Sequence, residues 1–149
     1  MRNNWYLENY TAQLPLILKH GAVLGSGGEG RTSAASRADL AEAAATVLTT
    51  DGHAGAVYEL GGDQAFTLAE LAAAIAAATG KPITYADLPA DSFAEALTEA
   101  GVPAELAHIL ADADLGLGRG ELVTASGDLS RLLGRPARTL ADVLADALR

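Results

Sequence analysis

The stretch VYELGGDQAFTLAELAAAIAAATG, residues 57–80, contains the signals of a strand, a turn and a helix in direct succession. The residues AVYEL, 56–60, have strand composition and are followed by the turn GGDQ. Thr67 and Glu70 have the capping-box spacing of a helix start, and Gly80 is a typical helix end. The apolar stripe of this helix is Leu68, Leu71 and Ile75. A strand that leads directly into an amphipathic helix indicates an α/β fold.

The same alternation extends outward from this stretch, with helices in the majority. Apolar residues at three- and four-residue steps predict helices over residues 5–20 with an interruption at Pro15, and over 36–52, 91–101, 103–114, 127–134 and 139–149. Short extended pieces are predicted at 22–25, 31–35 and 81–88, and a loop at 116–126. A few short strands, separated by helices, make a poor free-standing parallel sheet. We therefore expect one domain over 1–149 that is only part of an α/β fold.

Composition excludes several classes of function. The net charge of −9 and the pI near 4.6 argue against nucleic acid as a partner, because neutralising phosphates needs a basic surface. No basic run could hold an anionic membrane surface, and no apolar run is long enough to span a bilayer. The absence of cysteine excludes disulfides and thiolate chemistry. No signal-peptide pattern opens the chain, so we expect a cytoplasmic protein without nucleic-acid or membrane partners.

The run GSGGEG, residues 25–30, invites comparison with a phosphate-binding loop. A dinucleotide fingerprint would need a helix immediately after the glycines, whereas the following RTSAA looks extended. A hairpin-like connection between two short strands is the favoured interpretation.

Histidines and carboxylates offer little catalytic signal. His20, His53 and His108 lack ligand spacing, and we predict no metal site. The acidic stretch of Glu105, Asp112 and Asp114 is interpreted as a solvated face.

The opening residues RNNWYLENY, 2–10, combine flat rings with amide side chains. That mixture suits a planar, polar ligand, with stacking from the rings and orientation from the amides. The alternative is a helix start in which Asn residues cap and aromatic residues pack in the core. Residue types alone favour the alternative.

Four segments together resemble the NmrA-like atypical short-chain dehydrogenase/reductases. They are RNNWYLENY, SRADLAEAAATVL, VYELGGDQAFTLAELAAAIAAATGKPITY and DLSRLLGRPARTLADVL, in that order, and they span essentially the whole chain. The similarity is greatest to the NAD(P)H:quinone oxidoreductase type 2 branch. It implies the helix-rich C-terminal, substrate-side portion of a Rossmann-type NAD(P)-binding protein. Met1 would then match an interior position of a longer protein, so we expect a fragment without the N-terminal dinucleotide-binding half.

The resemblance also implies a site. It places residues 3–8 along the nicotinamide end of the cofactor, beside a quinone pocket. The implied cofactor-binding residues are Asn3, Asn4, Trp5, Tyr6, Leu7 and Glu8, and the implied substrate-binding residues are Trp5, Tyr6, Asn9 and Arg37. Asn4 stands where close relatives carry Gly. No tyrosine is followed four residues later by lysine, so the catalytic residues stay unassigned.

The implied activity is hydride transfer from NADPH to a quinone. Because half of the family's cofactor site is missing, we expect no tight cofactor binding and no turnover by this chain alone. The alternative is a non-enzymatic dinucleotide-sensing or protein-interaction module. Such a chain could also self-associate through exposed apolar surface.

Overall fold

The computed structural model describes residues 1–149 and has a helix-rich α/β fold with eight helices and six short strands. The predicted fold class is confirmed. Contacts group the chain into two compact units, residues 1–14, 33–65 and 122–149 in the first and residues 15–32 and 66–121 in the second. A single domain over 1–149 stays a prediction. No helix combines the length and the apolar composition that a membrane span requires.

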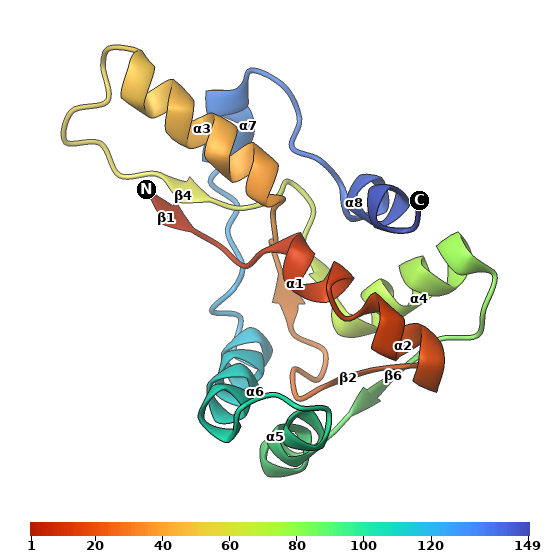
Figure 1. Ribbon diagram of the computed structural model, residues 1–149. Coiled ribbons are helices and arrows are strands. Elements are labelled where there is room, and N and C mark those ends of the chain that lie inside the picture. Colours follow the sequence, from red (N-terminus) through yellow and green to blue (C-terminus); the bar gives the residue numbers. More distant parts are fainter. The chain divides into compact units, whose positions relative to one another are not determined.

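The first unit is built on a short parallel pair, β1 (Arg2–Asn3) and β4 (Glu59–Leu60). In Figure 1 these two strands run side by side. Helix α3 (Arg37–Thr49) packs against α7 (Asp128–Leu133), and α1 (Leu7–Thr11) packs against α8 (Leu140–Ala147). The buried core beneath α3 and α7 consists of Ala35, Leu40, Ala43, Leu60, Leu129 and Ala137.

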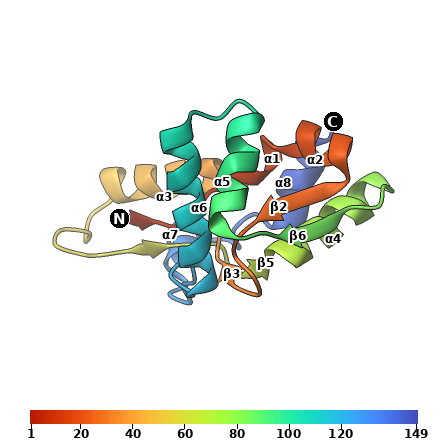
Figure 2. The ribbon, with the colours of Figure 1, turned by 90° about the horizontal axis from the view of Figure 1, so that it is seen from below.

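The second unit holds two further strand pairs. Strand β2 (Ala22–Gly25) pairs in parallel with β6 (Thr84–Asp87), and β3 (Arg31–Thr32) pairs antiparallel with β5 (Phe66–Thr67). Helix α4 (Leu68–Thr79) begins with the predicted capping box and buries its predicted stripe. Helices α5 (Ala90–Glu99) and α6 (Ala104–Gly118) lie side by side in both ribbon views (Figure 2).

Proline and serine positions explain two helix boundaries. The predicted helix over 5–20 is split into α1 and α2 (Leu14–His20), and Pro15 is the second residue of α2. Proline is tolerated there because first-turn amides have no partner within the helix. Ser36 caps α3, since its hydroxyl accepts a hydrogen bond from the N–H of Asp39.

Two predictions about the second unit are wrong. Strands β2 and β3 do not form a hairpin, because each pairs with a strand from elsewhere in the unit. The loop predicted from residue 116 starts later, because α6 continues to Gly118. Packing explains this extension, since a Cβ on Gly30 would lie 2.3 Å from the carbonyl oxygen of Leu117. Residues 25–30, which we call the glycine loop, thus pack closely against the last turn of α6. This packing outweighs the low helix propensity of glycine.

Candidate functional site

The segment that follows β1 runs beside the residues that precede α3. The carbonyl oxygen of Trp5 accepts a hydrogen bond from the N–H of Ala35 at 2.9 Å, and the N–H of Leu7 donates to the carbonyl oxygen of Ala35 at 3.0 Å. Tyr6 and Ala35 thereby form an isolated parallel bridge. This pairing fixes the opening segment next to the start of α3.

Four of the residues that the sequence analysis singled out come together at this place. The guanidinium carbon of Arg37 lies 5.1 Å from the ring centroid of Tyr6. The Nη2 atom of Arg37 donates to Oδ1 of Asn9 at 3.0 Å. The carboxylate of Glu8 accepts from the backbone N–H of Arg37, at 2.9 and 3.1 Å to its two oxygens. A ring, an amide, a carboxylate and an exposed guanidinium therefore form one cluster, which we call the Arg37 cluster.

The other predicted site residues occupy different surroundings. Asn3 is exposed in β1, and Trp5 is half-buried. The Asn4 side chain donates to the carbonyl oxygen of Leu122 at 3.2 Å and accepts from the N–H of Trp5 at 2.7 Å. Leu7 is only 1% exposed, so its side chain belongs to the core. Only Trp5 and the Arg37 cluster therefore present partly or fully exposed rings and charged groups.

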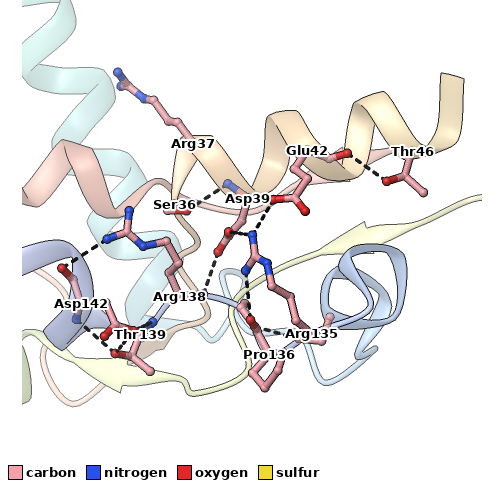
Figure 3. A network of polar contacts seen from close by, with 12 residues as sticks. Ser36, Arg37, Asp39, Glu42, Thr46, Arg135, Pro136, Arg138, Thr139 and Asp142 are labelled. Carbon is pink, nitrogen blue, oxygen red and sulfur yellow. Dashed lines mark hydrogen bonds and ion pairs between the residues drawn. The ribbon is translucent and has the colours of Figure 1, made fainter. Parts of the chain in front are cut away.

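A buried carboxylate holds the start of α3 from the other side. Asp39 is completely buried and accepts hydrogen bonds from Nη2 of Arg135 at 2.8 Å and from the backbone N–H of Arg138 at 2.7 Å. Figure 3 shows that Arg135 turns toward Asp39, whereas the side chain of Arg37 points away from this network. Asp39 therefore has a structural role that fixes α3 to the C-terminal segment, and Arg37 remains on the surface.

The backbone amides of the glycine loop, in the second unit, donate hydrogen bonds to side chains of the same chain. The N–H of Ser26 donates to Asp114 at 2.8 Å, that of Gly27 to the Tyr85 hydroxyl at 3.2 Å, and that of Gly28 to Asp87 at 3.0 Å. A phosphate cradle needs such amides free. With these amides engaged, the loop does not form a phosphate cradle.

The interpretation of the acidic stretch as a solvated face is wrong for Asp114. Burial raises the pKa of Asp114 to about 6, against the lowering effect of the Ser26 N–H, and the charge of Asp87 raises it further. Burial of the phenol and its hydrogen bond to Asp87 raise the pKa of Tyr85 above its usual value. The sequence signal for this cluster was the spacing of Tyr85 and Asp87, since alternate strand residues share a face.

The ring of His53 makes two contacts within the first unit. His53 lies in the turn after α3, where Nε2 is 2.8 Å from the Thr50 hydroxyl oxygen and Nδ1 is 2.7 Å from the Tyr58 hydroxyl oxygen. These contacts brace the turn. Nowhere do three His, Asp or Glu side chains lie close enough together to hold a metal ion.

Comparison with known sequences identifies relatives of about twice the length. No protein-family profile matches the chain. Over 142 residues, 95% of the chain, the sequence is 48% identical to Quinone oxidoreductase 2 of Escherichia coli, of which it covers 50%. It is 30% identical to NAD(P)H azoreductase of Xenophilus azovorans over 138 residues. This alignment covers 93% of the chain and 48% of that relative. The chain therefore spans about half the length of the curated relatives it matches.

Solved structures give the same picture. The crystal structure of an NADPH-dependent quinone oxidoreductase from Escherichia coli superposes with a TM-score of 0.96 and 46% identity, over 99% of this chain and 54% of that one. The triphenylmethane reductase of Citrobacter sp., solved in complex with NADP(H), gives a TM-score of 0.92 and 31% identity over 98% of this chain and 51% of that one. The match to half of each structure fits a C-terminal portion.

Proposed function

We propose that the chain forms the substrate-side portion of an NAD(P)H:quinone oxidoreductase. The reason is that it belongs to the NmrA-like atypical short-chain dehydrogenase/reductases. In this proposal residues 3–8 lie along the nicotinamide end of the cofactor, and Trp5, Tyr6, Asn9 and Arg37 contact the quinone. NADPH, when bound, supplies the hydride, while the protein positions the acceptor and excludes water.

The Arg37 cluster is the observation that supports this proposal. Its donor set fits a planar ring with polar substituents, since Asn9 offers an amide and Arg37 offers N–H donors at the surface. The backbone bridge between Tyr6 and Ala35 holds these groups in place without a ligand. A preformed arrangement of this kind lowers the cost of ordering on binding.

We further propose that the 149-residue chain alone neither binds NADPH tightly nor turns it over. The support is the glycine loop, whose amides already bond to Asp114, Tyr85 and Asp87. With those amides engaged, this loop does not provide the phosphate contacts of a dinucleotide site.

Titration of the purified chain with NADPH tests this proposal. Binding is followed by nicotinamide fluorescence, and turnover by NADPH absorbance in the presence of naphthoquinone. We expect no saturable change and no consumption above the protein-free rate. Saturable binding in the micromolar range by the chain alone would contradict the proposal.

Exposed apolar side chains favour a second candidate, a non-enzymatic protein-interaction module. Leu48 and Val57 of the first unit are 82% and 62% exposed. Size-exclusion chromatography with light scattering separates the candidates. A concentration-dependent increase in mass favours the interaction module, and a monomer at all concentrations argues against self-association.

A further inference from the structure

Arg37 differs from every other arginine of the chain. Of eight arginines, seven form an ion pair with an Asp or Glu side chain. Arg37 forms none, although the chain carries a net charge of −9. Its guanidinium rests instead on the Tyr6 ring and on the Asn9 amide oxygen. In a chain with a surplus of carboxylates, one exposed arginine thus forms no ion pair through its guanidinium.

The surroundings of Arg37 hold the guanidinium without neutralising it. Arginine has five N–H donors in a rigid plane, and only the bond to Asn9 occupies one of them within the chain. Stacking on a tyrosine ring restrains this plane and leaves its charge intact. Glu8, the carboxylate that contacts Arg37, bonds to the backbone N–H rather than to the guanidinium.

The start of α3 is not itself the anion site. The N–H of Arg37 already bonds to Glu8, and the N–H of Asp39 already bonds to the Ser36 hydroxyl. Two of the three first-turn amides of α3 are therefore engaged. The guanidinium side chain of Arg37 is therefore the main donor that this place offers to an anion.

We propose that Arg37, held by Tyr6 and Asn9, binds an anionic oxygen group carried by a planar aromatic ligand. The group is a sulfonate or carboxylate on the acceptor, or the phosphate next to the nicotinamide ring. The planar class of ligand rests on the proposed function, whereas the requirement for a negative charge rests on the unpaired guanidinium. The fork of N–H donors matches two oxygens of such a group.

The experiment uses Trp5 as the reporter. It is the single tryptophan, and its backbone bonds to Ala35, two residues before Arg37. Emission of the purified chain is titrated with naphthoquinone sulfonate and with uncharged naphthoquinone. The chain has no cysteine that could add to a quinone. Reduced nicotinamide mononucleotide and the matching riboside form a second pair of ligands, which distinguishes a cofactor phosphate from an acceptor anion.

Three variants test the charge of Arg37, the shape of its guanidinium and the effect of removing a positive charge elsewhere. Arg37→Gln should weaken binding of the sulfonate or of the mononucleotide about tenfold, because a charge-assisted hydrogen bond is lost. It should weaken binding of uncharged naphthoquinone much less, because Gln still offers an N–H donor to a quinone oxygen. Arg37→Lys should recover only part of the loss, because lysine keeps the charge without the fork. Arg2→Gln, which removes the same charge from an exposed pair with Glu59, should leave anion binding unchanged.

The outcomes separate this inference from the proposed function. Equal affinity of the wild type for charged and uncharged naphthoquinone, with the same change for both ligands in Arg37→Gln, would overturn the anion site and leave the quinone site standing. Arg37-dependent binding of the anions without any binding of uncharged naphthoquinone would support the anion site and contradict the quinone site. No response of Trp5 to any ligand would contradict both.

Discussion

Replacing Asp114 with asparagine should stabilise the chain, and the gain should increase with pH. The Asp114 carboxylate accepts the N–H of Ser26 at 2.8 Å, and burial raises its pKa from the usual 3.8 to about 6. The Asp114 carboxyl group therefore binds its proton more tightly in the folded state than in the unfolded state. The ionised carboxylate destabilises the fold, and this penalty disappears as the pH falls from 6 toward 4.

The two pKa values set the magnitude of the effect. Above pH 6 the full difference corresponds to at most about 3 kcal/mol, at about 1.4 kcal/mol for each pKa unit. At pH 5 the unfolded chain is mostly ionised and the folded chain mostly protonated, so about half of that penalty remains. Between pH 5 and pH 8 the free energy of unfolding of Asp114→Asn, relative to the wild type, should rise by about 1.4 kcal/mol.

Urea unfolding at several pH values, followed by far-UV circular dichroism, measures this difference. Asparagine keeps an oxygen that can accept the Ser26 N–H, so the comparison isolates the charge. Asp112→Asn is the matched control. It removes the same charge from an exposed residue of the same helix. A difference that does not vary with pH, or that is larger at pH 5 than at pH 8, would refute the reasoning.

The remaining predictions concern stability and are also read from urea unfolding. Leu7→Ala should cost about 2–5 kcal/mol, because Leu7 is buried in the core; a cost below 1 kcal/mol would contradict this placement. Asp39→Asn should cost about 1–3 kcal/mol through its weakened bond to Arg135, and a neutral effect would count against the network. Gly30→Ala should cost about 1–3 kcal/mol, since its Cβ would lie 2.3 Å from the Leu117 carbonyl oxygen; unchanged stability would show that the loop relaxes.

Local signals predicted the helices well, because their start and stop signals act within a few residues. The Thr67 capping box and the Ser36 cap are formed, and Gly80 ends α4 in the left-handed conformation that favours glycine. These features depend on hydrogen bonds within one turn of helix. Sequence reasoning reads them directly.

Features that depend on long-range pairing were not predictable in the same way. The partner of β2 is β6, about 60 residues further along the chain, so the glycine loop was misinterpreted as a hairpin. The burial of Asp114 depends on the contact between that loop and α6, which no periodicity reveals. Likewise, only the fold shows that Arg37 rests on Tyr6 while Asp39, two residues later, is buried.

A chimera tests the central claim most directly. Residues 1–149 replace the corresponding half of Escherichia coli Quinone oxidoreductase 2, to which the chain is 48% identical. NADPH-dependent reduction of naphthoquinone is then measured for the chimera and for the chain alone. We predict turnover by the chimera, none by the chain alone, and a lower rate for the chimera that carries Tyr6→Ala. A folded chimera without turnover, or NADPH oxidation by the chain alone, would contradict the proposal that the chain is the substrate-side portion of an NAD(P)H:quinone oxidoreductase.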